Sequence, residues 1–239
     1  MRKIAAVLCL TFLFLWPGSL SASQVIDKSQ NENILVFWTN GDSLKAVTLM
    51  CVRESGNPIG IVAIPLFVRV KHLGREFTIA ETYNAIGRPG LTDCLEDLFG
   101  IPIGCYLSVD QATLNKVSFM IGPVSMDGGI TTVSDIFEGT YTDCKVDPQA
   151  EVRQLAARLV EPRVIIKAPQ LFWILASEVK TNLSGRSLMG IYRVIQECGP
   201  GVLNKKVLQG NEYYVGGIKY RDVPPEAWVK TLQSTVNDV

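Results

Sequence analysis

The side chains that could do chemistry in this sequence are few. His72 is the only histidine, and no serine lies in a Gly-x-Ser-x-Gly setting, so a catalytic triad built on histidine is not indicated. The stretch GPVSMDGG, residues 122–129, lacks the strand–loop–helix context of a phosphate-binding loop, and a turn explains its glycines better.

The run GIVAIPLFVRV, residues 60–70, has the hydrophobicity of a buried strand. Functional groups of α/β proteins usually lie just beyond the ends of such strands. Here those positions hold Leu66 and Phe67, which carry no polar group. Arg69 follows them, either as a contact for a phosphate or as a solvated cation at the end of the strand.

The elements that would position these residues are predicted from apolar runs and helix signals. Strands are expected at 34–38, 46–52, 59–64 and 105–109, with hydrophobicity that is nearly continuous, as in strands covered on both faces. Turn residues at 53–60 favour a hairpin between the second and third of these strands. Helices are expected at 78–87, 91–100, 147–160, 171–179, 185–198 and after Pro224, with another that begins after Asp110 as its N-cap. The mixture predicts one α/β domain, a three-layer α/β/α sandwich with a central mixed sheet.

Composition and the N-terminal residues narrow the class of protein. The 239 residues are 47% hydrophobic, with 23 basic and 23 acidic side chains, so no basic excess points to a nucleic-acid partner. Arg2 and Lys3 precede an apolar run, residues 4–16, and small residues follow near residue 23, as in an export signal. We expect a signal peptide over 1–23, a polar linker over 24–33 and the α/β domain over 34–239. The alternative is an uncleaved membrane anchor; either way the domain works outside the cytoplasm.

The cysteines do not form a complete disulfide framework in the expected mature chain. Five follow the signal, an odd number, and none has the spacing of a metal site. We expect most of them to be buried and reduced. The five are Cys51, Cys94, Cys105, Cys144 and Cys198.

The order of several weak motifs resembles the LytR-CpsA-Psr family of bacterial cell envelopes, whose domain is also described as a cell-envelope-related transcriptional attenuator. That family has an Arg-x-Asp-Thr strand, a strand that ends in Ile-Pro-Arg-Asp, a Lys-Ile-Asn step and a Gly-Ile step into a Tyr-x-x-Val-Asp strand. The similarity covers residues 33–195, and each motif is weak by itself. The matching stretches are KAVTLM (45–50), AIPLFVRV (63–70), TIAETY (78–83), LFGIPIGCYLSVD (98–110), MIGPV (120–124), DPQAEVRQ (147–154) and VKTNLS (179–184), the last similar to a helix that carries Thr-Asn.

The resemblance implies transfer of a glycopolymer from a polyprenyl-pyrophosphate carrier to peptidoglycan, with arginines and a carboxylate-held Mg²⁺ that neutralise the diphosphate. The chain departs from the pattern at the positions that matter most. Val47 replaces the metal-binding Asp, Leu66 and Phe67 replace the Arg-Asp pair, Ala80 replaces the Asn, and Ala150 replaces an Arg. We therefore expect no intact catalytic set.

The cationic and polar residues that remain define the expected binding site. For Arg153 and Gln154 the alternative is a polar pair on the surface of a helix. Asp147 is the remaining candidate for a metal carboxylate, and we expect no cofactor unless the protein is active, in which case Mg²⁺ is expected. The expected substrate-binding residues are Lys45, Arg69, Lys145, Arg153 and Gln154.

Three functions remain open, and whether the protein is an enzyme stays open with them. The first is a secreted or envelope-bound pseudoenzyme that binds a polyprenyl phosphate or a glycan carrier in an apolar cavity. The second is an active transferase with a rearranged site. The third is a structural or interaction protein of the cell envelope that has the cavity filled by side chains. Expected partners are a polyprenyl-linked glycan or lipid and peptidoglycan, with membrane contact only through the N-terminal segment and no nucleic acid.

Overall fold

The computed structural model describes residues 32–53, 58–72, 74–126, 129–138, 147–159 and 161–236. The expected signal peptide, most of the expected linker, Cys144 and Lys145 lie outside the described residues. The last two residues of the expected linker belong to the first strand, which begins at Glu32.

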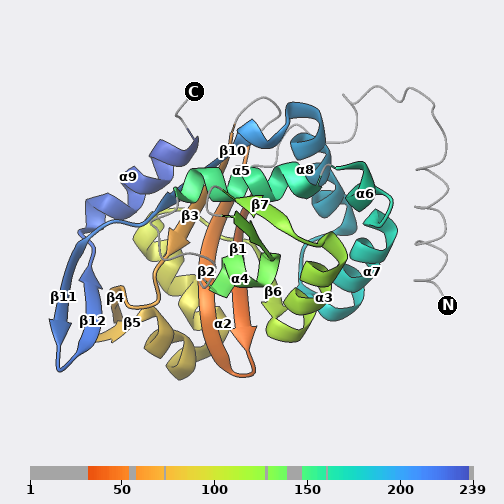
Figure 1. Cartoon of the computed structure of the whole chain (residues 1–239). Helices are drawn as coiled ribbons and strands as arrows, with labels where there is room; N and C mark the ends of the chain where they lie inside the picture. The colour runs from red at the N-terminus through yellow and green to blue at the C-terminus, as the bar shows by residue number, and fades with distance from the viewer. Residues whose placement is uncertain are drawn as a thin grey trace.

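The described residues form a six-stranded mixed sheet with the strand order β10–β3–β2–β1–β6–β9 (Figure 1). β1 pairs antiparallel with β2 and parallel with β6, while β3 pairs antiparallel with β2 and parallel with β10. The strands are β1 (Glu32–Asn40), β2 (Ser43–Val52), β3 (Ile59–Ile64), β6 (Cys105–Asp110), β9 (Lys180–Thr181) and β10 (Leu203–Val207). The strands expected from the four apolar runs are therefore confirmed, as is the mixed sheet.

Helices cover both faces of this sheet. The helices are α2 (Ile79–Phe99), α3 (Gln111–Ile121), α4 (Val133–Glu138), α5 (Pro148–Leu159), α6 (Pro162–Ile165), α7 (Ala168–Glu178), α8 (Gly185–Cys198) and α9 (Pro225–Val236), with a 3₁₀ turn at Pro200–Val202. Separate two-stranded hairpins pair β4 (Arg69–His72) with β5 (Arg75–Thr78), β7 (Val124–Met126) with β8 (Gly129–Thr131), and β11 (Asn211–Val215) with β12 (Ile218–Asp222).

The two faces of the sheet have separate apolar cores because side chains alternate along each strand. Val62 belongs to the cluster that includes residues of α2 and α9, where Trp228 packs edge-on against Phe99 with ring centroids 5.1 Å apart. Its neighbour Ile61 belongs to a cluster with Ala156 of α5 on the opposite face. In Figure 1, α2 lies behind the sheet and α5 in front of it, so the expected three-layer α/β/α sandwich is confirmed.

Local sequence explains where the elements start and break. Thr78 caps α2, because its hydroxyl accepts from the Glu81 backbone N–H and the Glu81 carboxylate accepts from the Thr78 backbone N–H. The helices expected at 78–87 and 91–100 form one element with a break at Gly87, whose φ of 69° is non-helical. The Asp110 cap of α3 is also present.

The VKTNLS segment differs from the expected helix. Lys180 and Thr181 form the edge strand β9, and Asn182 hydrogen bonds to the backbone of β6 through Tyr106 N–H and Gly104 C=O, both at 2.8 Å. These bonds hold the segment extended along β6. The described cysteines are free, with Cys51 and Cys94 buried, Cys105 half-buried and Cys198 exposed.

Candidate functional site

The candidate site lies at the edge of the sheet where the parallel strands β1, β3 and β6 end and where β2 begins. The carboxyl ends of parallel strands are the usual location of ligand sites in α/β sheets. This edge has two parts: the residues at the positions that the family motifs assign to the diphosphate chemistry, and a cavity beside β1 and β6.

Val47 lies in the apolar core, and Leu66 packs against the same core rather than in a polar site. Val47 is 1% exposed, pairs with Ile64 across β2 and β3, and belongs to the cluster against which Leu66 packs. The carbonyl of Leu66 accepts from the Ala80 N–H at 3.2 Å, at the start of α2. The structure therefore places Val47 and Leu66 in one apolar cluster and joins Leu66 to Ala80 by a backbone hydrogen bond; the family motifs assign all three positions to the active site.

Phe67 faces a different environment, the β11–β12 hairpin. Its carbonyl accepts from the Arg221 backbone N–H at 3.0 Å. The Lys219 ammonium lies 4.6 Å and the Arg221 guanidinium 5.0 Å from the centre of its ring, within the range of cation–π attraction. Both cations also pair with Glu212, so their charge is partly neutralised.

Arg69 is held by two carboxylates and an aromatic ring. Its Nε and Nη2 donate to the Oδ1 and Oδ2 of Asp222 at 2.8 and 3.1 Å, and its Nη1 lies 2.6 Å from Glu76 Oε2. The guanidinium lies 5.3 Å from the centre of the Tyr213 ring. Hydrogen bonding to Arg69 lowers the pKa of Asp222 below its usual value, and the same bonds raise the pKa of Arg69. The donors with which Arg69 could bind a phosphate in bidentate geometry are therefore already bonded to Asp222 and Glu76.

The other expected binding residues that the structure describes do not form one group. Lys45 is exposed near the start of β2. Arg153 is exposed and Gln154 half-buried on α5, which packs on the face of the sheet opposite to Val47. Asp147 is exposed, and its carboxylate accepts from the Gln149 N–H at the start of α5.

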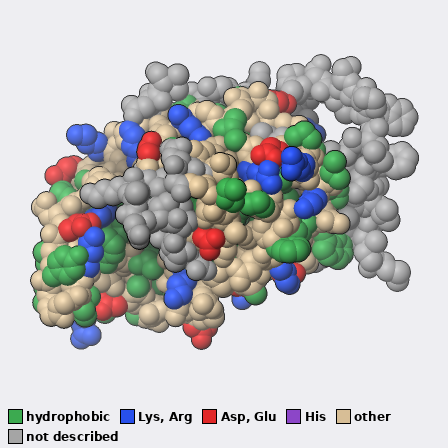
Figure 2. Space-filling model, in the orientation of Figure 1, with side chains coloured by type: hydrophobic (Ala, Val, Ile, Leu, Met, Phe, Trp, Pro, Cys, Tyr) green, Lys and Arg blue, Asp and Glu red, His purple; other side chains and the backbone are tan. Residues whose placement is uncertain are grey.

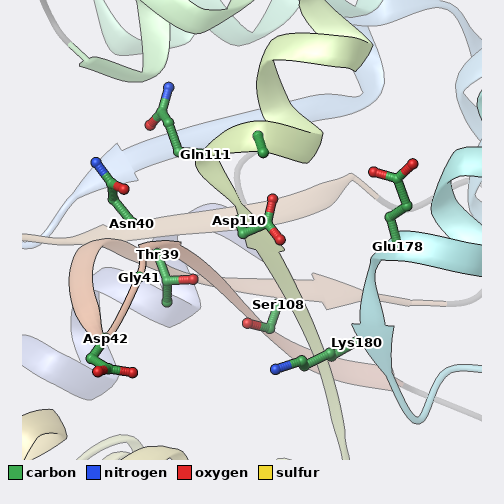
Figure 3. Close-up of a pocket in the computed structure, with 10 residues that line it drawn as sticks. Thr39, Asn40, Gly41, Asp42, Ser108, Asp110, Gln111, Glu178 and Lys180 are labelled. Carbon is green, nitrogen blue, oxygen red and sulfur yellow. The ribbon is translucent and has the colours of Figure 1, made fainter.

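A polar cavity of about 430 Å³ opens beside the ends of β1 and β6 (Figure 3). Its walls come from the β1–β2 turn, the end of β6, the first turn of α3 and the α7–β9 junction. Gly41, with a φ of 58°, makes the tight β1–β2 turn that forms one wall. The lining residues are Thr39, Asn40, Gly41, Asp42, Ser108, Asp110, Gln111, Ala112, Glu178 and Lys180.

Several charges of this cavity are already balanced by neighbouring groups. The carboxylate of Asp110 accepts from the Thr113 backbone N–H at 2.7 Å, which lowers the pKa of Asp110. Glu178 accepts two hydrogen bonds from the Lys116 ammonium, at 2.7 and 2.8 Å. Of the lining, only Asp110 was expected from the sequence to have a role, as a helix cap. The polar run TNGDS at the end of the first strand and Ser108 near the end of β6 were the signals that could have indicated a site.

The residues at the expected metal position do not fit a divalent cation. Mg²⁺ needs hard oxygen ligands, and Val47 and Leu66 supply none. Among the residues that the structure describes, no group of three or more His, Cys, Asp or Glu side chains is placed to hold a metal ion.

Within the described part of the chain, no helix combines the length and the apolar character that crossing a membrane requires.

Solved structures of similar fold relate the chain to known proteins. TagV from Bacillus subtilis superposes with a TM-score of 0.67 and 15% identity, over 89% of this chain and 99% of TagV. A structure of TagT bound to LI-WTA superposes with a TM-score of 0.61 and 16% sequence identity, over 91% of this chain and 96% of TagT. The protein gbs0355 from Streptococcus agalactiae superposes with a TM-score of 0.65 and 12% sequence identity, over 92% of this chain and 93% of gbs0355.

Sequence comparison by itself finds no relative: no protein-family profile and no curated protein matches the chain. The relationship is therefore carried by the fold, which spans nearly the whole of each neighbour. The motif order pointed to the same group. The chain has the fold of the LytR-CpsA-Psr proteins.

Proposed function

We propose that this chain is an exported cell-envelope protein with the LytR-CpsA-Psr fold that binds a polyprenyl-phosphate or glycan ligand without catalysing glycopolymer transfer. The observation that carries the proposal is the packing of Val47 and Leu66 into the apolar core at the positions where the motifs of the family have a metal carboxylate and an arginine. The ion pairs of Arg69 with Asp222 and Glu76 support it, because they occupy the guanidinium that follows Leu66 and Phe67 in the sequence.

Transfer from a polyprenyl-pyrophosphate carrier needs stabilisation of the diphosphate that leaves. Arginines in bidentate geometry and a divalent cation provide it by electrostatic attraction aimed at the developing charge. Neither Val47 nor Leu66 can take part in such an interaction. The proposal therefore retains the ligand class of the fold and omits the reaction.

The ligand class is supported by one neighbour of similar fold, TagT, which was solved bound to LI-WTA, a lipid-linked precursor of wall teichoic acid. Export is supported by the signal-like residues at the N-terminus, from Arg2 and Lys3 through the apolar run. The binding proposal is tested on the full chain, by mass spectrometry of an organic extract and by calorimetric titration with a polyprenyl phosphate in detergent. Co-purified or titratable polyprenyl phosphate supports ligand binding; no lipid in either measurement contradicts it.

A second function is favoured by the same apolar cluster. If Val47, Leu66 and their neighbours leave no room for a lipid, the domain is a structural or interaction protein of the envelope that uses the fold as a scaffold. The same two measurements separate the functions, because a scaffold neither retains nor binds the lipid. The active transferase with a rearranged site is the outcome in which the full chain transfers glycan.

A further inference from the structure

We propose that the cavity between the ends of β1 and β6 is a binding site for one uncharged sugar ring. The inference rests on the proposed function for its biological context, since a glycan ligand carries such rings. The cavity is separate from the apolar cluster around Val47, because it opens toward β6 and β9 on the other side of β1. Its volume of about 430 Å³ is within the range of small-ligand pockets.

The cavity has hydrogen-bonding groups that the protein does not use. Asp42 and Lys180 reach into it from opposite walls in Figure 3, and Ser108 lies on the strand between them, paired in register with Lys180. Asn40 adds an amide, which both donates and accepts. Within the described part of the chain, these four side chains have no hydrogen-bond or ion-pair partner. A polyhydroxylated ring, whose hydroxyls both donate and accept, complements this mixture.

The charge of the cavity favours a neutral ligand. Glu178 is neutralised by Lys116, and Asp110 interacts with the first backbone N–H groups of α3. The two remaining charges, Asp42 and Lys180, are of opposite sign and face each other. The three carboxylates of Asp42, Asp110 and Glu178 outnumber the two ammonium groups of Lys116 and Lys180, which leaves one net negative charge around the cavity. This charge disfavours the diphosphate end of a lipid carrier, and the cavity accepts an uncharged part of the glycan.

Two other classes of ligand fit less well. The three acids of the lining do not form a metal-binding group among the described residues. The first turn of α3 is not an open anion site, because Asp110 already accepts from its Thr113 N–H. The recognition therefore depends on hydrogen bonds from Asn40, Asp42, Ser108 and Lys180.

The test is a titration of the full chain with one hexose ring in three charge states, in which ligand-observed NMR measures binding. The probes are glucose, protonated glucosamine and glucose 1-phosphate. We expect glucose to bind more tightly than either charged ring. Asn40→Ala and Ser108→Ala should each weaken glucose binding by about fivefold to tenfold, the loss of one hydrogen bond, while Asn211→Ala, an exposed asparagine on β11, should leave it unchanged.

A variant that is expected to bind one probe more tightly is the control for misfolding, because a misfolded variant would lose binding. Asp42→Asn removes the negative charge that faces Lys180, so it should raise the affinity for glucose 1-phosphate above that of the wild-type chain. No binding of glucose, tighter binding of glucose 1-phosphate to the wild type, or equal loss in Asn211→Ala would overturn the proposal. The titration uses neither polyprenyl phosphate nor a transfer assay, so it can succeed where the lipid-binding proposal fails, and the reverse.

A competition arm separates the two sources of such a ring. A polyprenyl-linked saccharide in detergent micelles displaces glucose if the ring arrives on the lipid carrier. A soluble peptidoglycan disaccharide displaces it if the ring belongs to the cell wall. Displacement by either compound supports the site, and displacement by neither contradicts it.

Discussion

At the residue scale, the positions that the family motifs assign to the active site fall into two kinds: some pack in the apolar core, and one forms ion pairs within the protein. Val47 and Leu66 contribute to the core of the domain, so their side chains stabilise the fold instead of a ligand. Arg69 keeps the residue type of a phosphate ligand, but its donors are used by Asp222 and Glu76. In this chain these positions therefore make structural contacts within the protein.

Val47→Asp is expected to destabilise the domain strongly, because it places an unpaired carboxylate in a site that is 1% exposed. Urea unfolding should show a loss of more than about 4 kcal/mol, compared with about 2 kcal/mol for the control Val47→Ala. Adding Leu66→Arg to Val47→Asp should recover part of this loss, and Mg²⁺ should then raise the urea midpoint. A Val47→Asp variant as stable as Val47→Ala would show that this space is open to water.

The Arg69–Asp222 pair is expected to make stability depend on pH. Because the folded pKa of Asp222 is lowered, its contribution is present above the unfolded pKa of about 3.9 and is lost as the pH falls through the folded value. The measurement is the free energy of unfolding in urea as the pH is lowered from about 6 to about 3, a range that includes the unfolded pKa. This free energy should fall less steeply for Asp222→Asn than for the wild type.

Arg69→Gln serves as the matched partner of that variant. It should flatten the same part of the pH profile, and the double variant should lose less stability than the sum of the two single variants. Additive losses would contradict direct coupling between the two side chains. Both groups are partly exposed, so the coupling is expected to be about 1 kcal/mol or less.

Part of this residue-level arrangement could be predicted from the sequence. The motif order predicted that Val47, Leu66 and Phe67 lie near one another around one concave site. Val47 and Leu66 share one apolar cluster, whereas the Phe67 ring lies beside Lys219 and Arg221 of β12. The motif order did not predict the partners of Arg69, because Asp222 is 153 residues away and its strand β12 is not covered by the motifs. The cavity was missed because its lining comes from four separate segments, and the motif stretches that include Ser108, Asp110 and Lys180 do not show that these segments meet.

At the element scale, periodicity and caps located most helices and strands, while edges depended on tertiary contacts. The Thr78 and Asp110 caps act through local hydrogen bonds, so they could be predicted from a few residues. The two-residue strand β9 could not, because its extended form depends on hydrogen bonds between Asn182 and β6.

The packing of α9 on β3 predicts a tight requirement for glycine at position 60. A Cβ on Gly60 would lie 2.6 Å from Thr235 Oγ1 and 2.8 Å from Val236 Cγ1, closer than side chains approach. Gly60→Ala should therefore lower the free energy of unfolding by about 1–3 kcal/mol through overpacking. Gly104→Ala, where the added methyl has no neighbour within 4 Å, is the control and should change stability little. Equal stability of both variants would show that α9 can move away from the sheet.

At the scale of the whole molecule, the edge of the sheet where the parallel strands end has two parts. One is apolar, around Val47 and Leu66, and the other is the polar cavity beside β1 and β6. Exposed charge is distributed over the visible surface rather than gathered in one patch (Figure 2), in keeping with the balanced composition. The fold spans nearly the full length of TagV and TagT. This likeness is one of fold, and fold alone does not determine the chemistry at the strand ends.

The central claim is that this chain has the LytR-CpsA-Psr fold without the transfer reaction. The most direct measurement is transfer of a labelled glycan from a polyprenyl-pyrophosphate carrier to peptidoglycan by the full chain, with Mg²⁺ and with Mg²⁺ plus a chelator, beside an active transferase. The account predicts the same background signal with and without chelator, because Val47 and Leu66 provide no ligand for the cation or the diphosphate. Transfer above background that the chelator abolishes would contradict it.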